Sequence, residues 1–310
     1  MDSGSAIRVF APATVANVGC GYDVLGLALE TYGDILQLSK RDDHKLIIQS
    51  IKGATDLPFL ATENVATVAI QAMLEVLDIQ QGFDLIIEKN IAPGSGLGSS
   101  ASSSAAAVFA ANELLGHPFT KKELVAFAME GERSASGVAH ADNVAPALLG
   151  GFTVIRGYDP LDVFNIPYPD DLFVTIFFPQ VTIKTSDAKR ILKRQIDLKD
   201  AVTQWGNVAG LVAGLILKDH ELIKRSLQDV IVEPIRSILI PLYQDVKQIC
   251  MDAGAIGFNI SGSGPSMFAL TNSKTTAQEM IQKVSDLYKS QDISLFSFVS
   301  SINSKGAVVI

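Results

Sequence analysis

A glycine-rich stretch at residues 93–102, Pro-Gly-Ser-Gly-Leu-Gly-Ser-Ser-Ala-Ser, has the residue types and spacing that suit phosphate binding. Residues 83–91 before it are rich in β-branched and aromatic side chains and predict a strand, and the Ala-rich residues after it predict a helix. Glycines let the backbone approach a ligand closely, and the first turn of a helix points unpaired N–H groups at it. Because the helix dipole favours an anion at that end, the stretch predicts a phosphate site.

Two common phosphate loops do not fit this stretch. A Walker A motif needs Gly-Lys followed by Ser or Thr, and no lysine lies between Lys89 and Lys121. A dinucleotide motif also fails, because Gly94, Gly96 and Gly98 alternate. What remains is Pro-x-x-x-Gly-Leu-Gly-Ser-Ser-Ala, where a serine hydroxyl at the helix start can bind a hard cation such as Mg²⁺. The alternative is an ordinary loop and N-cap before an Ala-rich helix.

The polar residues 132–143 form a second candidate site. A helix is predicted over residues 120–132, with Thr120 as the N-cap residue of a capping box. Glu132 then falls at the helix C-terminus, where a carboxylate is electrostatically unfavourable, so binding a divalent cation would explain its presence. His140 is either a ligand contact or a half-buried histidine with satisfied ring nitrogens.

Other polar residues on predicted loops are candidates with structural alternatives. Asn17 and Asp23 flank the glycines of a tight loop, where they either contact a ligand or cap turns. Asn64 precedes a helical pattern over residues 65–77 and is either its N-cap or a ligand contact. Residues 261–266, Ser-Gly-Ser-Gly-Pro-Ser, lie between two predicted strands and exceed what a plain hairpin turn requires.

The composition limits the cellular setting and the partners. A net charge of −8 over 310 residues argues against nucleic acid and against an anionic membrane, since both need a basic face. No apolar run reaches the roughly 18 residues of a spanning helix, and the N-terminal residues show no signal-peptide pattern. Cys20 and Cys250 do not make a disulfide framework. These features predict a soluble cytoplasmic protein.

The chain length suits one large or two medium domains. Three prolines and several acidic residues at 157–171 predict a boundary, which we place between residues 1–165 and 166–310. In the second part, predicted strands and helices alternate in a way that suits an antiparallel sheet covered by helices, of the ferredoxin-like type. The predicted helices there cover residues 187–193, 198–217, 221–227, 242–253 and 275–289. The fold class is therefore expected to be α+β.

Five strings together resemble the homoserine kinases, a family within the GHMP kinase superfamily, across nearly the whole chain. They are APATVANVGCGYDVLGLAL, PGSGLGSSAS, GVAHADNVAPALLGGFT, VIVEPIRSILIP and NISGSGPS. The second resembles the phosphate-binding motif of the superfamily, and the first, third and fourth are typical of homoserine kinases. The resemblance implies a two-domain GHMP kinase fold, with an N-terminal α/β nucleotide-binding domain, a C-terminal ferredoxin-like domain and the active site between them.

The resemblance also implies an activity and its cofactors. The reaction is transfer of the ATP γ-phosphate to the hydroxyl of L-homoserine in threonine synthesis, with ATP and Mg²⁺, by an enzyme that is often a homodimer. The implied nucleotide-binding residues are Asn64, Val65, Lys89, Pro93, Gly94, Ser95, Gly96, Leu97, Gly98, Ser99 and Ser100. The implied metal ligands are Ser100 and Glu132. Asp142 and Asn143 complete the implied catalytic set.

The implied contacts to the amino-acid substrate come from separate parts of the chain. They are Asn17, Asp23, His140, Asn143, Thr185, Lys189 and Arg236. Arg236 suits a forked contact to the substrate carboxylate, with Asp23 beside the α-ammonium group. The family usually has an arginine where this chain has Lys189, so either Lys189 substitutes as a point charge or Arg190 reaches in. The position of Lys189 matches that of the family arginine, which favours Lys189. Because lysine is not equivalent to arginine at a forked contact, weaker binding of the substrate carboxylate is expected.

The mechanism implied by the resemblance lacks an obvious base. In members similar to mevalonate kinase, an aspartate beside the substrate hydroxyl is taken as the base, whereas the matching residue here is Asn143, whose amide cannot accept a proton. We therefore expect catalysis by positioning and charge neutralisation. The alternatives are a kinase of the superfamily for another alcohol, such as mevalonate, and a non-catalytic ligand sensor. Arg236 with Asp23 favours an amino acid over a hydroxy acid.

Overall fold

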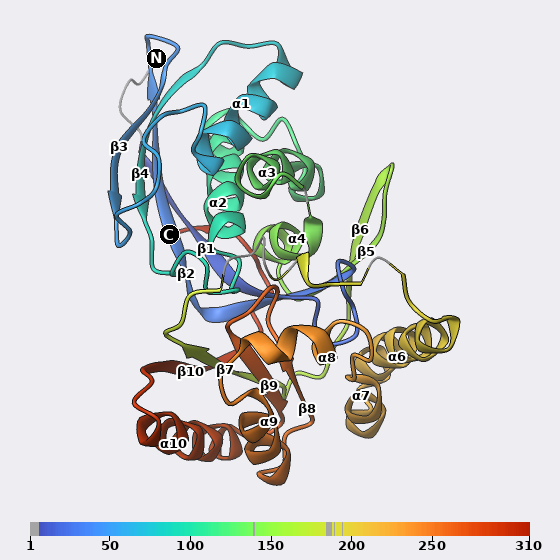
Figure 1. Cartoon of the computed structure of the whole chain (residues 1–310). Helices are drawn as coiled ribbons and strands as arrows, with labels where there is room; N and C mark the ends of the chain where they lie inside the picture. The colour runs from blue at the N-terminus through green and yellow to red at the C-terminus, as the bar shows by residue number, and fades with distance from the viewer. Residues whose placement is uncertain (1–5, 139, 184–187, 189, 194) are drawn as a thin grey trace.

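The computed structural model describes residues 6–138, 140–183, 188, 190–193 and 195–310. Figure 1 shows two lobes, each built on a sheet with helices against it. In the first lobe the strand order is β11-β1-β2-β4-β3, with β5 paired to β2 and β6 paired to β5. The strands are β1 (Ile7–Ala16), β2 (Leu25–Arg41), β3 (Leu46–Lys52), β4 (Gly82–Glu88), β5 (Phe152–Tyr158), β6 (Leu161–Ile166) and β11 (Val308–Val309). The helices are α1 (Val65–Leu77), α2 (Ser99–Leu114), α3 (Lys121–Ser136) and α4 (Ala141–Leu149).

The second lobe has an antiparallel sheet of order β10-β7-β9-β8, with α9 and α10 against it. Its strands are β7 (Phe173–Pro179), β8 (Gly257–Ile260), β9 (Met267–Thr271) and β10 (Leu295–Ser301). Its helices are α6 (Leu198–Leu217), α7 (His220–Ser226), α8 (Glu233–Arg236), α9 (Tyr243–Asp252) and α10 (Lys274–Ser290), with a short 3₁₀ turn, η1 (Ser237–Leu239), after α8. The predicted α+β class with an antiparallel second sheet is confirmed.

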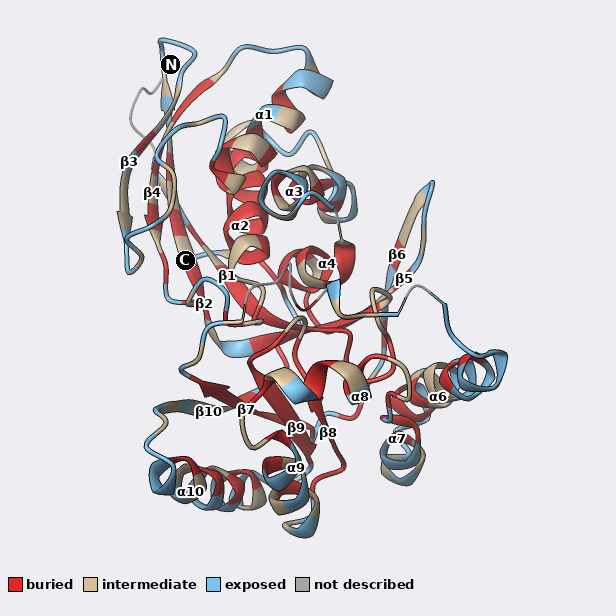
Figure 2. Ribbon diagram, in the orientation of Figure 1, coloured by how far each residue is buried: buried red, intermediate tan, exposed pale blue. Residues whose placement is uncertain are grey.

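Helix α2 is the centre of the first lobe. It packs against β1, β2, α1, α3 and α4, and Figure 2 shows it buried along its length. A helix buried on every side must have side chains that suit a dry environment, and α2 uses mainly Ala and Ser. Because these side chains are small, neighbouring elements approach the backbone of α2 closely. The helix that carries the glycine-rich stretch is therefore fixed on all sides.

Several elements differ from the predictions. From the sequence, residues 7–10 were expected to form a short strand that ends at Pro12, but β1 continues to Ala16. The register with β2 shifts between Pro12 and Thr14, which accommodates the missing N–H of proline. The β5–β6 hairpin occupies part of the predicted boundary region, and α4 was not predicted, because Pro146 interrupts its short helical pattern. Helix α3 continues four residues beyond the predicted end, to Ser136.

The chain passes from the first sheet to the second between β6 and β7, but it later returns. Ile302 forms a bridge to Leu29, and Val309 pairs with Val9 of β1. The first sheet thus contains the C-terminal residues, and the division at residues 165 and 166 stays a prediction. In the described ranges no helix has both the length and the apolarity needed to cross a membrane.

Candidate active site

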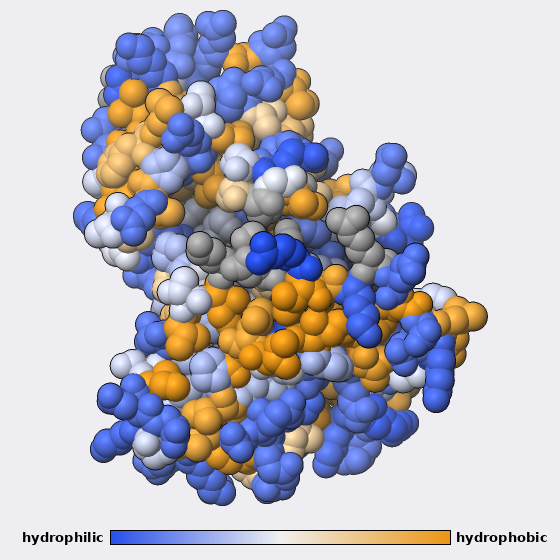
Figure 3. Space-filling model, viewed as in Figure 1, coloured by the Kyte–Doolittle hydropathy of each residue, from blue (hydrophilic) through white to orange (hydrophobic). Residues whose placement is uncertain are grey.

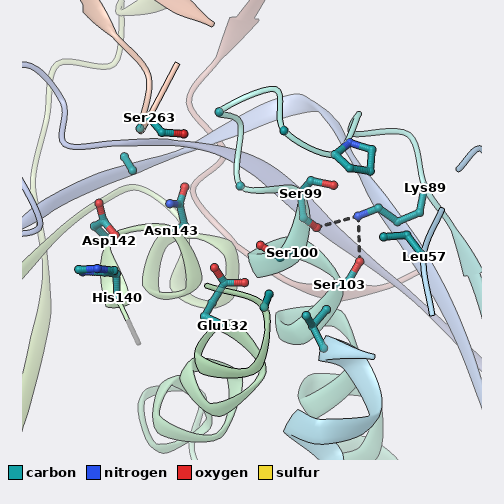
Figure 4. A pocket seen from close by; sticks show the side chains of 18 of the residues that line it. Leu57, Lys89, Ser99, Ser100, Ser103, Glu132, His140, Asp142, Asn143 and Ser263 are labelled. Carbon is teal, nitrogen blue, oxygen red and sulfur yellow. Dashed lines mark hydrogen bonds between the residues drawn. The ribbon is translucent and has the colours of Figure 1, made fainter. Parts of the chain in front are cut away.

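A cavity of about 700 Å³ collects residues from both glycine-rich loops, α1, α3, α4 and α8. Figure 4 shows side chains at this cavity from several of these segments, among them Ser100 of α2, Glu132 of α3 and Asn143 of α4. The predicted site residues on its walls are Asn17, Asp23, Asn64, Val65, Lys89, Pro93, Gly94, Gly96, Gly98, Ser99, Ser100, Glu132, His140, Asp142, Asn143 and Arg236. The sequence predictions missed other wall residues, among them Tyr22, Leu57, Pro58, Glu63, Ser103 and Ser263.

The glycine-rich stretch requires glycine for two different reasons. Gly94, Gly96 and Gly98 have φ angles of 76°, 82° and 70°, in the left-handed region that other residues rarely adopt. At Gly98, the N-cap residue of α2, a Cβ would also lie 2.1 Å from Thr14 Oγ1. At Gly96 it would lie 2.6 Å from the carbonyl oxygen of Ser261, whereas at Gly94 it would meet nothing within 4 Å.

The second glycine loop, residues 261–266, packs directly on the first. Ser261 Oγ donates to the carbonyl oxygen of Gly96 at 2.7 Å, and the Ser266 amide donates to the carbonyl oxygen of Ser95 at 3.1 Å. The small residues of this connection between β8 and β9 allow the two loops to approach each other closely. This explains why residues 261–266 exceed what a plain hairpin turn requires. Ser95 and Leu97 are buried and do not line the cavity, so they support the loop from behind rather than face a ligand.

Lys89 is buried next to the start of α2. Its ammonium group forms an ion pair with Asp34 of β2 and donates to the Ser99 carbonyl oxygen at 2.7 Å and to Ser103 Oγ at 2.9 Å (Figure 4). Burial lowers the pKa of the Lys89 ammonium from its usual value, and the charge of Asp34 partly offsets this. These three contacts engage the three N–H groups of the lysine. Lys89 therefore holds the first turn of α2, which follows the glycine-rich stretch, in place.

Asp34 was missed by the sequence predictions. Its Oδ1 accepts from the amides of Asn90 and Ile91, each at 2.9 Å, and its Oδ2 pairs with Lys89. An acidic residue within the apolar pattern of β2 was the available signal, since a buried carboxylate needs such partners. Asp34 fixes the chain where β4 leads into the glycine-rich stretch.

Asn64 is the N-cap residue of α1, as one of its two predicted alternatives had it, and the ligand contact stays a prediction. Its Oδ1 accepts from the Ala66 amide at 3.0 Å, so Asn64 is the N-cap of α1, and its Nδ2 donates to the Pro58 carbonyl oxygen at 2.8 Å. The residue also lines the cavity, together with Val65 and Leu57. This end of the cavity combines apolar walls with one oriented amide.

Glu132 does not end its helix, contrary to the prediction. Helix α3 runs on to Ser136, and Gly137 caps it in the left-handed region, so Glu132 lies one turn before the end. The argument from an unfavourable helix terminus is therefore weaker than predicted. The position of Glu132 still favours a role in binding. Figure 4 shows its carboxylate directed into the cavity that Ser100 also lines.

Asn17, Asp23 and His140 meet at the other end of the cavity. Asn17 Oδ1 accepts from the Asp23 amide at 3.0 Å, and Asp23 Oδ1 lies 3.4 Å from His140 Nδ1. Both Asn17 and Asp23 have positive φ angles, 69° and 58°, which Asn and Asp tolerate better than most residues. Tyr158, another missed residue, donates to the Asp23 carbonyl oxygen at 2.8 Å and accepts from the Ala141 amide at 3.3 Å. It joins this loop to the start of α4.

Arg236 is buried at the same end of the cavity. Its Nε donates to the Ala188 carbonyl oxygen and its Nη1 to the Gly262 carbonyl oxygen, both at 3.0 Å, and its guanidinium carbon lies 5.2 Å from the centre of the Tyr22 ring. A guanidinium group has five N–H donors, so these two bonds fix its plane without using all of them. Thr185 and Lys189 lie outside the described residues. The exposed Arg190 is not among the described residues that line the cavity.

Asn143 connects the two ends of the cavity. It lies in the first turn of α4, beside Asp142, and its Oδ1 accepts from Thr14 Oγ1 at 2.7 Å. A Cβ on Gly98 would lie 2.9 Å from this oxygen, so Asn143 borders the end of the glycine-rich stretch.

Family comparisons agree with this geometry. Residues 64–151 match the model of the GHMP kinases N terminal domain, and residues 211–290 match that of the GHMP kinases C terminal domain. The homoserine kinase of Chloroherpeton thalassium is 49% identical over 296 residues, covering 90% of this chain and 93% of that protein. The homoserine kinase of Chlorobium phaeobacteroides is 46% identical over 98% of this chain and 99% of that protein. The chain belongs to the homoserine kinase family.

Solved structures support the same family, and more distant ones share only the fold. The crystal structure of homoserine kinase from Cytophaga hutchinsonii has a TM-score of 0.96 at 50% identity, covering 100% of this chain and 99% of that one. Mevalonate kinase from L. major has a TM-score of 0.73 at 16% identity, over 97% of this chain and 98% of that one. The second likeness shows the fold alone. The homoserine kinase fold thus brings 16 predicted residues to one cavity, as named above.

Proposed function

We propose that this member of the homoserine kinases transfers the γ-phosphoryl group of ATP to the side-chain hydroxyl of L-homoserine, giving O-phospho-L-homoserine. One observation carries the proposal: the glycine-rich loop at the N-terminus of α2 opens on the same cavity as Asn17, Asp23, His140 and Arg236. A phosphate donor at the first and an amino acid at the second would meet near Asn143. By the same resemblance, the enzyme would act in threonine synthesis, in the cytoplasm, as a homodimer.

The nucleotide would bind at the end of the cavity formed by α1, β4 and α2. The backbone N–H groups of residues 94–100 would hold the triphosphate, aided by the positive end of the α2 dipole. Asn64, Val65 and Lys89 would border the base, with Leu57 supplying apolar surface. Because Lys89 and Asp34 fix the first turn of α2, these donors would be aligned before the nucleotide arrives.

The residues present fit a magnesium ion that would bind together with the nucleotide. Ser100 and Glu132 both line the cavity, and no group of three or more His, Cys, Asp or Glu residues suited to a metal occurs in the described ranges. Magnesium is typically held by one or two protein oxygens plus substrate phosphates and water, so one hydroxyl and one carboxylate form a suitable set. When bound, the ion would neutralise charge on the phosphates.

The amino acid would be held by groups of opposite charge at the other end. Arg236 would bind its carboxylate through the N–H donors that do not bond Ala188 and Gly262, and Asp23 would bind its ammonium group. His140 contacts Asp23 and would help to orient it. The cavity wall would thereby direct the substrate hydroxyl toward Asn143 and the phosphate loop.

Catalysis would rest on alignment and charge neutralisation. Asn143 cannot act as a base, since its amide oxygen accepts from Thr14 and the group does not take up a proton at neutral pH. In a loose phosphoryl-transfer transition state little activation of the nucleophile is required, so the proton can leave late, to the phosphate or to solvent. If Asp142→Asn and Asp23→Asn each abolished turnover while substrate binding persisted, a base would have to be assigned and this mechanism abandoned.

The direct test measures ADP release with Mg-ATP and a panel of L-homoserine, D-homoserine, L-threonine, L-serine and mevalonate. We expect strong turnover with L-homoserine alone. Turnover with mevalonate instead would retain the superfamily and overturn the substrate. Tight ATP binding without turnover on any alcohol would indicate a ligand sensor.

A further inference from the structure

Helix α8 reverses the usual burial of charged and apolar side chains. Its two charged residues, Glu233 and Arg236, are only 6% and 3% exposed, whereas Pro234 is exposed and Ile238, in the turn that follows, is 78% exposed. Figure 3 shows that the outer surface over α8 is largely apolar. A helix of four residues cannot hold its own shape in water. The position of α8, and of the Arg236 guanidinium at its end, therefore depends on the polar contacts beneath it.

The buried side chain of Asp229 fixes the start of α8. Its Oδ1 accepts from the amides of Ile231 and Val232, and its Oδ2 accepts from the amide of Glu233, each at 2.9 Å. Because Asp229 is only 7% exposed, these donors replace the water that a carboxylate otherwise needs. The backbone that enters α8 is thus fixed amide by amide.

Glu233 fixes the same helix to the second lobe. Its Oε1 pairs with the ammonium group of Lys247 on α9, and its Oε2 accepts from Asn259 Nδ2 of β8 at 2.8 Å. Two buried carboxylates thus hold a helix of one turn, one at its entry and one in its first residue.

Gln204 of α6 connects this entry to a second segment. Its Nε2 donates to Asp229 Oδ1 at 3.0 Å and to the carbonyl oxygen of Cys20 at 2.8 Å, and its Oε1 accepts from the Val230 amide at 3.0 Å. Both N–H groups and the oxygen of the buried Gln204 amide are therefore bonded. Any other orientation of this amide would leave a buried polar group without its partner, which is costly.

The two segments joined by Gln204 each lead to a charged side chain of the acceptor site. Asp23 lies three residues after Cys20, and Arg236 is the last residue of α8. On the cavity side the same segments meet again, because Asn17 Nδ2 and Arg236 Nη1 both donate to the Gly262 carbonyl oxygen at 3.0 Å. The loop and the helix are thus joined at two levels, by Gly262 at the cavity and by Gln204 behind it.

We propose that Gln204 is a positioning residue that sets the separation between Asp23 and Arg236. It thereby favours acceptors that carry an ammonium and a carboxylate group on the same carbon atom, since both groups are then contacted at once. Gln204 is not among the described residues that line the cavity, so it acts through the two segments and not by touching the substrate. This role rests on the proposed binding of a zwitterionic amino acid between Asp23 and Arg236.

The first experiment compares three acceptors in the wild type and in Gln204→Met, which keeps the length of the side chain but loses its hydrogen bonds. L-Homoserine carries both charged groups, 4-hydroxybutanoate lacks the ammonium group, and 3-aminopropan-1-ol lacks the carboxylate. We expect kcat/KM for L-homoserine to fall about 10- to 30-fold, mainly through KM, with the KM for ATP unchanged. The two truncated alcohols should lose less than about 3-fold, measured as turnover or as competitive inhibition constants, because each uses one charged residue alone. Equal losses for all three acceptors would overturn the proposal.

The matched control is Asn112→Leu, which removes a buried side-chain amide far from the acceptor site. Asn112 of α2 accepts from the Phe119 amide at 3.0 Å and donates to the Phe119 carbonyl oxygen at 2.9 Å, and it is not among the described residues that line the cavity. Its thermal midpoint should fall, but the preference for L-homoserine over the truncated alcohols should stay at the wild-type value. A second variant, Gln204→Glu, retains the acceptor for Val230 and loses both donors, so it should reduce the same preference. An unchanged preference in Gln204→Glu would contradict the proposed role.

Hydrogen exchange of the ligand-free protein tests the link without any acceptor. In Gln204→Met the amides of residues 17–23 and of residues 229–236 should both exchange at least about 5-fold faster, while those of α2 keep their wild-type rates. The control Asn112→Leu should leave both segments unchanged. If the wild type does not phosphorylate L-homoserine, the proposed function fails. If either segment of Gln204→Met keeps its wild-type exchange, the positioning role of Gln204 fails.

Discussion

The two ends of the cavity are built in different ways. The end proposed for the phosphates, called the phosphate-loop end here, is formed by one continuous segment, and the end proposed for the amino acid is called the acceptor end. The backbone of the first is fixed by glycine geometry, by the buried Lys89–Asp34 pair and by the loop at 261–266. The acceptor end is assembled from side chains on separate segments, and its Asp23–His140 pair is about 30% and 26% exposed. The first end is thus tied into the core by the contacts behind its loop, whereas the second combines the buried Arg236 and Asn17 with the partly exposed Asp23 and His140.

This difference predicts how each end responds to substitution. Changes at the phosphate-loop end should affect both folding stability and catalysis, because the same contacts serve the core and the loop. Changes at the acceptor end should raise the KM for the amino acid and leave the KM for ATP nearly unchanged, and at the partly exposed Asp23–His140 pair they should also leave stability nearly unchanged. The following substitutions test this contrast, beginning with the largest expected effect.

Asp34→Asn should lower the free energy of unfolding by about 3–5 kcal/mol, because it leaves the buried ammonium of Lys89 without its counter-charge. Urea unfolding at neutral pH measures the loss. The double variant Asp34→Asn/Lys89→Met should recover part of it, since no unpaired charge then remains buried. A loss below about 1 kcal/mol, typical of exposed pairs, would mean that the phosphate-loop end is not tied to the core as described.

Gly98→Ala should lower kcat/KM about 100-fold, because the new Cβ would displace Thr14 or the start of α2 and misalign the loop. Steady-state kinetics with ATP and L-homoserine measure the effect. Gly94→Ala is the matched control. Gly94 also has a left-handed φ angle, but a Cβ added there would meet nothing within 4 Å. Its thermal midpoint should fall less than that of Gly98→Ala. Equal losses in the two variants would assign the effect to strain alone.

Arg236→Lys should raise the KM for L-homoserine about 10-fold, through loss of the forked guanidinium contact. The KM for ATP should change much less, and this separation is the signature of the acceptor end. Arg225→Lys, at an exposed residue of α7 that is not among the described residues lining the cavity, serves as the control. Parallel changes in both KM values would show that Arg236 acts on the whole cavity.

His140→Gln should have the smallest effect, a rise of about 2- to 5-fold in the KM for L-homoserine. The histidine and Asp23 are partly exposed, and Asn17 also holds Asp23 through its amide. Stability in urea should not change measurably. A loss of kcat by orders of magnitude would give His140 a direct part in the chemistry and break the contrast between the two ends.

The same contrast explains what could be predicted from the sequence. The glycine-rich stretch, the strand before it and the helix after it follow one another in the chain, so local patterns were enough to predict these elements and the start of the helix after Gly98. Phosphate binding by the stretch stays a prediction. Asp34 and Tyr158 act through contacts with residues far along the chain, which no local pattern shows. The predicted end of α3 at Glu132 was wrong, since the helix ends four residues later. Arg133 and the three small residues after it extend α3 but have no apolar periodicity, so no local pattern showed the extension.

The pairing of β11 with β1 has a consequence for synthesis of the protein. Val9 finds its partner in Val309, so the first sheet cannot be completed until nearly the whole second lobe has been translated. Until then the edge of β1 has unpaired N–H and C=O groups, which other chains can pair with. The nascent first lobe therefore emerges from the ribosome with an open edge, and its last strand arrives only after α10 and β10.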